Sequence, residues 1–311
     1  MKKIKVFAPA SVANVSCGFD IMGFSVDEIG DFVTLILSEE IKENVIEVSG
    51  PYGHLIPSDL AKNTASVAID SLLRSLKIEK NYSIHLEKNL PLGSGMGSSA
   101  SSSAAAVFAM NELLNKPFSL VELIPFAMEG ERIACGSSHA DNVAPSLLGG
   151  FVLIRSYFPL EVIKVNCPDD LFSVVVCPEV ELHTKDARRI LANQIEMKLA
   201  IQQSANTAGM ILGLLTNDID LIGRSMSDVI VEPIRKQLIP GYDLCKEMAL
   251  RNGAVGAGIS GSGPSIFAIC QGKESVLEVQ KAMKKVFGDL NIKCNSYIGK
   301  LNAGGAKIIE K

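Results

Sequence analysis

Several features that mark other classes of protein are absent from this chain of 311 residues. Although 47% of the residues are hydrophobic, no apolar run reaches the length of about eighteen residues that a membrane-spanning helix requires. The N-terminal stretch 1–6 mixes lysines with apolar side chains, whereas a signal peptide needs a continuous apolar segment. We therefore expect a soluble, cytoplasmic protein with no membrane partner.

Basic residues are not clustered, and cysteines do not occur in pairs. The chain has 30 Lys and Arg against 34 Asp and Glu, a net charge of −4, whereas nucleic-acid-binding proteins carry dense basic patches. The seven cysteines include no Cys-x-x-Cys pair, which favours reduced thiols over a disulfide framework or a zinc site. We expect neither a nucleic-acid partner nor a structural zinc.

The most distinctive stretch is a glycine-rich turn at 91–100 that leads into an alanine-rich segment. Gly93, Gly95 and Gly97 allow positive φ angles and a close approach of the backbone to an anion. Apolar residues then recur near the helical period over 98–114, which predicts a helix whose unpaired N–H groups face the turn. Such a turn can bind phosphate, although taken alone it is more often an ordinary helix N-cap.

This turn has neither the Gly-Lys-Ser/Thr end of a P-loop nor the Gly-x-Gly-x-x-Gly order of a dinucleotide site. Its string Pro-x-Gly-x-Gly-x-Gly-Ser-Ser-Ala resembles the second motif of the GHMP small-molecule kinases. Two further motifs of that family occur in the expected order, at 9–20 and at 256–264. The third motif, Gly-x-x-x-Ser-Gly-Ser-Gly-Pro, packs against the phosphate turn in that family.

Two stretches are similar to the homoserine kinase branch of the family. Residues 9–20 match its Pro-Ala-Ser-x-Ala-Asn start and Gly-Phe-Asp end, with Ser16-Cys17 in place of the usual Gly-Pro. Residues 139–145 match its His-x-Asp-Asn-Val-Ala-Pro segment, with Ala140 in place of a common proline. The resemblance implies an ATP- and Mg²⁺-dependent transfer of phosphate to the side-chain hydroxyl of L-homoserine, a step of threonine biosynthesis.

The same resemblance implies which residues bind ATP and the metal. Mg²⁺ prefers hard oxygen ligands, and Ser99 and Glu131 would provide them. The residues expected to contact ATP are Asn63, Lys88, Pro91, Leu92, Gly93, Ser94, Gly95, Met96, Gly97, Ser98, Ser99 and Ala100. By themselves, Asn63 and Lys88 are equally compatible with solvated surface positions, and Glu131 with a charge at a helix end.

The substrate of such an enzyme carries an α-carboxylate, which a guanidinium binds bidentately. Arg188 and Arg235 stand where the homoserine kinases have such arginines, whereas the neighbouring Arg189 is compatible with the surface. Asn142 is placed to hold the substrate hydroxyl. The residues expected to contact the substrate are Asn14, Asp20, His139, Asp141, Thr184, Arg188, Arg235 and Gly261. Apart from the two arginines and Gly261, each of these residues alone could be a cap or turn residue, and so could Asn142.

The implied catalytic set is Asp141, Asn142, Ser99 and Glu131. Asp141 is either a general base, as in several GHMP branches, or a partner of the substrate ammonium. Because a metaphosphate-like transition state asks little of the nucleophile, our hypothesis is positioning by Asp141 and Asn142 with stabilisation by Mg²⁺ and the amides of the turn. Two rivals remain: a GHMP kinase for another alcohol, such as mevalonate or shikimate, and a catalytically silent ATP-binding regulator.

The expected fold is α+β, with the two-domain GHMP kinase architecture and possible homodimers. The resemblance implies a domain like ribosomal protein S5 domain 2 at 1–165 and a ferredoxin-like domain at 166–311, with the boundary between Tyr157 and Asp170. The patterns predict strands at 5–10, 32–37, 45–48, 82–88, 151–154, 160–165, 172–177, 266–270 and 292–298. They predict helices at 59–76, 98–114, 120–133, 193–215 and 275–286, and one that starts at 184.

Overall fold

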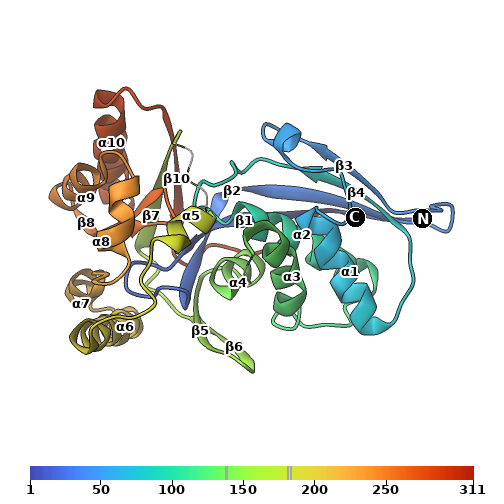
Figure 1. Cartoon of the computed structure of the whole chain (residues 1–311), viewed down its shortest axis with the longest axis horizontal. Coiled ribbons are helices and arrows are strands. Elements are labelled where there is room, and N and C mark those ends of the chain that lie inside the picture. Colours follow the sequence, from blue (N-terminus) through green and yellow to red (C-terminus); the bar gives the residue numbers. More distant parts are fainter. Residues whose placement is uncertain (137–138, 181, 183) are drawn as a thin grey trace.

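The computed structural model describes the whole chain except residues 137, 138, 181 and 183 and the side chains of Cys135, Thr184 and Lys185. In this part of the chain, the backbone forms a larger and a smaller sheet, each with helices packed against it (Figure 1). No described helix is both long and apolar enough to span a membrane.

The larger sheet has seven strands among the described residues, in the order β11-β1-β2-β4-β3, with β5 paired to β2 and β6 to β5. They are β1 (Lys2–Ala13), β2 (Met22–Leu37), β3 (Val45–Ser49), β4 (Tyr82–Glu87), β5 (Phe151–Tyr157), β6 (Leu160–Val165) and β11 (Lys307–Glu310). The pair β3 and β4 is parallel, and a helix connects the two strands. Because β11 pairs with β1, both chain ends lie at the same side of the molecule (Figure 1).

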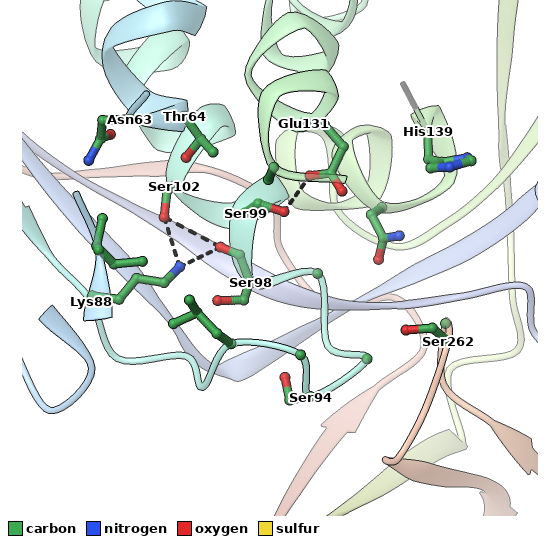
Figure 2. Close-up of a pocket in the computed structure, with 18 of the residues that line it drawn as sticks. Asn63, Thr64, Lys88, Ser94, Ser98, Ser99, Ser102, Glu131, His139 and Ser262 are labelled. Carbon is green, nitrogen blue, oxygen red and sulfur yellow. Dashed lines mark hydrogen bonds between the residues drawn. The ribbon is translucent and has the colours of Figure 1, made fainter. Parts of the chain in front are cut away.

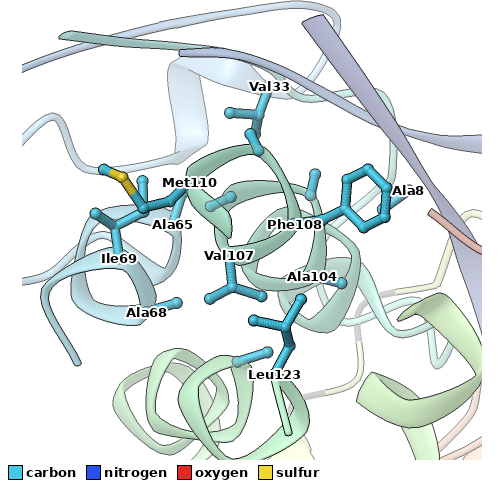
Figure 3. Packing of buried hydrophobic residues seen from close by; sticks show 14 of the residues in the cluster. Ala8, Val33, Ala65, Ala68, Ile69, Ala104, Val107, Phe108, Met110 and Leu123 are labelled. Carbon is cyan, nitrogen blue, oxygen red and sulfur yellow. The ribbon is translucent and has the colours of Figure 1, made fainter. Parts of the chain in front are cut away.

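Helices pack against one face of this sheet (Figure 1). They are α1 (Thr64–Leu76), α2 (Ser98–Leu113), α3 (Ile124–Cys135) and α4 (Ala140–Leu148); a short 3₁₀ helix, η1 (Gly53–Leu55), follows β3. Helix α2 lies between the sheet, α1 and α3, and nearly all of its residues are buried (Figure 3). Its alanines and serines are small enough for neighbours to surround it on all sides. The buried serines have partners, as Ser101 shows by donating to the carbonyl oxygen of Ala8 at 2.8 Å.

The smaller sheet has the order β10-β7-β9-β8, and its strands are all antiparallel. Its strands are β7 (Leu171–Pro178), β8 (Ala254–Ile259), β9 (Ile266–Gln271) and β10 (Cys294–Lys300). The helices of this half are α5 (Thr184–Arg189), α6 (Met197–Thr216), α7 (Ile219–Ser225), α8 (Glu232–Arg235), the 3₁₀ helix η2 (Lys236–Leu238), α9 (Tyr242–Arg251) and α10 (Lys273–Asp289). This strand order is that of a ferredoxin-like sheet, which confirms the expectation for the second half.

A shared hydrophobic cluster joins the two sheets. Phe24 of β2 stacks on Phe151 of β5, with ring centroids 6.4 Å apart, and meets Phe267 of β9 edge-on at 5.8 Å. All three rings are fully buried. Because these rings come from both halves, the residues near the junction are held in fixed relative positions. The division at residue 165 stays a prediction.

Most predicted elements are present, with shifted ends. The strand at 160–165 coincides with β6, and the helix at 98–114 matches α2 to within one residue. The helix predicted from residue 59 begins only at Thr64, because Asn63 caps it by accepting a hydrogen bond from the N–H of Ala65. Helices α4, α7, α8 and α9 and strands β8 and β11 were not predicted: Pro145 lies inside α4, and glycines interrupt the pattern of β8.

Candidate active site

The glycine turn lies between β4 and α2 and has the predicted backbone conformation. Gly93, Gly95 and Gly97 have φ angles of 63°, 78° and 64°, a region that L residues with side chains rarely adopt. Gly97 is the N-cap of α2. The unpaired N–H groups of the first helical turn therefore lie beside the turn, where they can bind an anion.

The third motif packs against this turn. The Ser260 hydroxyl donates to the Gly95 carbonyl oxygen at 2.6 Å, and the N–H of Ser265 donates to the Ser94 carbonyl oxygen at 3.2 Å. A Cβ atom at Gly95 would lie 2.3 Å from the carbonyl oxygen of Ser260. Close backbone approach, as well as φ, therefore requires glycine here.

A cavity of about 510 Å³ opens over the turn (Figure 2). The predicted residues that line it are Asn63, Lys88, Leu92, Gly93, Ser94, Gly95, Gly97, Ser98, Ser99, Glu131, His139, Asn142 and Gly261. Met96 and Ala100 are fully buried, so only their backbone could contribute to binding. Asn63 is also fully buried: its amide oxygen accepts from the N–H of Ala65 at the start of α1, and its amide nitrogen donates to the carbonyl oxygen of Pro57 in the loop before this helix.

Ser99 and Glu131 meet at the wall of this cavity (Figure 2). The Ser99 hydroxyl, in the first turn of α2, donates to Oε2 of Glu131 on α3 at 2.6 Å. Glu131 is 4% exposed. A hydroxyl and a carboxylate are hard oxygen donors, so the pair fits a Mg²⁺ ion that also keeps water and phosphate oxygens. Among the described residues there is no group of three or more acidic, His or Cys side chains that could hold a metal ion.

Lys88 lies under the turn in a fully buried ion pair. Its ammonium is 2.5 Å from Oδ2 of Asp31 on β2, and the two side chains are 1% and 0% exposed. It also donates to the carbonyl oxygen of Ser98 at 2.5 Å and to the hydroxyl of Ser102 at 2.9 Å (Figure 2). An ammonium has three donors, and these three contacts use all of them. A contact between Lys88 and ATP would therefore come from the rest of the residue.

Asn14 and Asp20 lie in the loop between β1 and β2, both with positive φ angles. The Asn14 amide accepts from the N–H of Asp20 at 3.0 Å and donates to the carbonyl oxygen of Gly261 at 2.7 Å. The Asp20 carboxylate lies 2.8 Å from Nη2 of Arg188 and 3.6 Å from Nδ1 of His139. Burial lowers the pKa of His139, so its ring is neutral at pH 7.

Both predicted arginines pack on the ring of Phe19. The guanidinium carbons of Arg188 and Arg235 lie 5.4 Å and 5.2 Å from its centroid, within the range of cation–π contacts. Arg235 is 3% exposed and donates to the carbonyl oxygens of Ala187 and Gly261, each at 3.1 Å. Burial and the neighbouring Arg188 lower its pKa to about 10, so the guanidinium stays charged at pH 7.

Asp141 is on α4 and is 2% exposed. Its Oδ1 atom is buried and has no hydrogen-bond partner among the described residues. Burial, followed by the charges of Asp20 and Glu131, raises its pKa to about 8. A buried carboxyl of this kind suits a cationic ligand that would replace its missing solvation. Thr184, the remaining predicted substrate residue, begins α5, but its side chain lies outside the described part of the chain.

Comparison with known proteins decides the family. A family model described as the GHMP kinases N terminal domain matches residues 61–150, and one described as GHMP kinases C terminal matches residues 210–289. A homoserine kinase of Chlorobium phaeobacteroides is 46% identical over 99% of this chain and 100% of its own length. The chain belongs to the GHMP kinase family.

Two more comparisons place this GHMP kinase within its family. A homoserine kinase of Methanococcus vannielii is 41% identical over 92% of this chain and 94% of its own. The crystal structure of homoserine kinase from Cytophaga hutchinsonii is 52% identical and has a TM-score of 0.95, covering 99% of this chain and 98% of that one. The expected two-domain GHMP kinase fold is thereby confirmed.

Three residues of this GHMP kinase site could not be identified from the sequence: Asp31, Phe19 and Tyr157. Asp31 is the clearest, because no pattern in the sequence distinguishes it from the nearby exposed acidic residues Asp27 and Glu28. Phe19 stood inside a recognised motif, but no pattern indicates which ring two arginines will share. Tyr157 donates from its hydroxyl to the carbonyl oxygen of Asp20 at 2.7 Å, and nothing in the sequence connects these two residues.

Proposed function

We propose that this GHMP kinase transfers the γ-phosphoryl group of ATP to the side-chain hydroxyl of L-homoserine, giving O-phospho-L-homoserine and ADP. This proposal rests on one observation, the proximity of the glycine turn to a group of charged side chains. Beside a glycine turn suited to polyphosphate lie acidic residues and arginines that suit the two charges of an α-amino acid. The similar homoserine kinases named above support the same choice of substrate.

ATP is proposed to bind with its phosphates on the turn and the N-terminus of α2. Ser99 and Glu131 would hold Mg²⁺, which, when bound, neutralises charge that develops on the phosphate oxygens. The buried pair of Lys88 and Asp31 keeps the turn in place. The turn amides add hydrogen bonds that are already oriented before the reaction.

The substrate is proposed to lie across the junction of the two halves. Its α-carboxylate would be bound by Arg188 and Arg235, and its ammonium by Asp20 and Asp141. The side chains of Asp20 and Arg188 pair with each other at 2.8 Å. A zwitterionic substrate can replace this pair, with its ammonium on Asp20 and its carboxylate on Arg188, so that neither side chain is left unpaired. His139, Asn14, Thr184 and Gly261 would add polar contacts.

Asn142 would place the substrate hydroxyl beside the γ-phosphate. Because the transition state of phosphoryl transfer is loose, positioning is more important than removal of the hydroxyl proton. Ammonium binding is the role we propose for Asp141, and the alternative of a general base is tested below. Cytoplasmic location, the absence of nucleic-acid and membrane partners, and a homodimer remain proposals from the sequence.

One assay tests the function. ADP release is coupled through pyruvate kinase to the oxidation of NADH by lactate dehydrogenase, and the phosphorylated product is identified by ³¹P NMR. The acceptors are L-homoserine, 4-hydroxybutanoate, which lacks the ammonium, 3-aminopropan-1-ol, which lacks the carboxylate, mevalonate and shikimate. We expect turnover with homoserine alone. Equal turnover with mevalonate or shikimate would mean another alcohol kinase, and ATP binding without turnover of any acceptor would favour the regulatory relative.

A further inference from the structure

We propose that Ser11 is a positioning residue that fixes the amide of Asn142, so that the NH₂ group of that amide faces the substrate. Ser11 lies near the end of β1 and is completely buried. Its hydroxyl donates to Oδ1 of Asn142, in the first turn of α4, at 2.9 Å. The inference rests on the proposed function, in which Asn142 contacts the substrate hydroxyl.

Three segments meet at Ser11. Its backbone N–H donates to the carbonyl oxygen of Met96 at 3.1 Å, which ties β1 to the glycine turn. A Cβ atom at Gly97 would lie 2.1 Å from the Ser11 hydroxyl and 2.9 Å from Oδ1 of Asn142. Glycine is therefore required at this position for the hydroxyl and the amide to lie against the N-terminus of α2. The contact between Ser11 and Asn142 is thus built into the place where the phosphates are expected.

The two ends of an asparagine amide are chemically different. The oxygen only accepts hydrogen bonds, whereas the nitrogen provides two donors. Since Oδ1 of Asn142 accepts from Ser11, the planar amide directs its nitrogen away from β1. Asn142 lines the cavity, so the group that it offers to a ligand is a donor.

A donor in this position has a definite consequence for the reaction. It can bind the oxygen of the substrate hydroxyl or an oxygen of the γ-phosphate, both of which carry lone pairs. It cannot accept the hydroxyl proton. A carbonyl oxygen in its place would instead face the negative phosphate oxygens and weaken their binding. By donating to the amide oxygen, Ser11 holds Asn142 in the productive orientation without contacting the substrate.

The test is a double-mutant cycle on the full-length protein, with homoserine and ATP as substrates. We expect Ser11→Ala to lower kcat by about tenfold to thirtyfold with the KM for ATP nearly unchanged, because one charge-neutral hydrogen bond is lost. If Ser11 acts through Asn142, the double variant Ser11→Ala with Asn142→Ala is no slower than Asn142→Ala alone. A further loss in the double variant would overturn the proposal.

Two more variants separate orientation from packing. Ser146→Ala is the matched control, because Ser146 is buried on the same helix and donates to the carbonyl oxygen of Pro9 on β1 at 2.8 Å. An equal loss of kcat in Ser146→Ala would show that loosening α4 is sufficient, and would overturn the proposal. Asn142→Asp replaces the NH₂ group with an oxygen. We expect it to be as slow as Asn142→Ala, and retained activity would mean that an acceptor faces the substrate.

Failure of this inference can be told from failure of the proposed function. A wild-type protein that does not phosphorylate homoserine contradicts the function itself. A wild-type protein that is active, with a Ser11→Ala variant that is folded and equally fast, contradicts only the role of Ser11. Thermal unfolding and the KM for ATP of each variant establish that the fold and the nucleotide site are intact.

Discussion

The ammonium of Lys88 lies 2.5 Å from the carboxylate of Asp31, and both side chains are buried beneath the glycine turn. The other carboxylate oxygen accepts hydrogen bonds from the N–H groups of Asn89 and Leu90, at 2.9 Å and 3.2 Å. The carboxylate of this ion pair therefore binds the backbone just before the turn, and the ammonium binds the carbonyl oxygen of Ser98, the first residue of α2. The pair thus holds both ends of the turn through contacts within the protein.

The first prediction concerns this ion pair. Lys88→Met leaves the buried carboxylate of Asp31 without its countercharge, and we expect the free energy of unfolding to fall by about 3–5 kcal/mol. Urea denaturation measures it. The control is Lys5→Met, which breaks a partly exposed pair with Glu87 and is expected to cost at most about 1 kcal/mol. Equal, small effects in the two variants would mean that the buried pair does not hold the turn.

The second prediction concerns the proposed metal ligands. Glu131→Gln keeps the shape of the side chain but removes its charge, so we expect about a hundredfold loss of kcat and a higher requirement for Mg²⁺. Titration of activity with Mg²⁺ at saturating ATP measures both. Glu129→Gln, on the same helix but paired with Arg132 at the surface, should leave them unchanged. An unaltered Mg²⁺ requirement in Glu131→Gln would remove this residue from the metal site.

The third prediction concerns the substrate carboxylate. Arg235→Ala should raise the KM for homoserine by about thirtyfold or more with little effect on the KM for ATP, since a buried carboxylate loses its partner. Arg189→Ala is the control, because Arg189 is exposed and pairs only with Asp186 among the described contacts. Steady-state kinetics with each substrate varied in turn will decide. Equal losses for both substrates would show that Arg235 does not bind the carboxylate.

The fourth prediction follows from the raised pKa of Asp141. Below about pH 8 this carboxyl is protonated and neutral in the free enzyme, whereas binding of the substrate ammonium favours its charged form. We therefore expect kcat/KM for homoserine to rise with pH, by up to about tenfold per unit, until it levels off near pH 8. Asp141→Asn should abolish this dependence. A flat profile in the wild type would contradict the assignment.

The same variant separates the two roles left open for Asp141. If the residue binds the ammonium, Asp141→Asn chiefly raises the KM for homoserine. If kcat falls by about four orders of magnitude or more while substrate affinity is unchanged, Asp141 is a general base after all. Full kinetics at pH 8 with both substrates measure the two parameters separately.

The sequence by itself determined those features that depend on neighbouring residues. The three glycines of the turn have positive φ angles because that conformation is a property of each residue. The strands β4 and β6 and the helix α2 follow from the side-chain pattern of short segments. The family motifs added the approximate membership of the site and the packing of the third motif on the turn, but not the contacts between individual side chains.

Tertiary structure alone decided which side chains meet. Asp31 and Lys88 are 57 residues apart, and Ser11 and Asn142 are 131 residues apart. No periodicity in the sequence relates such positions. They come together because β1, β2 and β4 pair in one sheet and α2 and α4 pack on it. Burial then determines the chemistry of these groups. Desolvation and neighbouring charges raise the pKa of Asp141, and Asp31 and Lys88 form an ion pair in the interior. No sequence pattern contains this information.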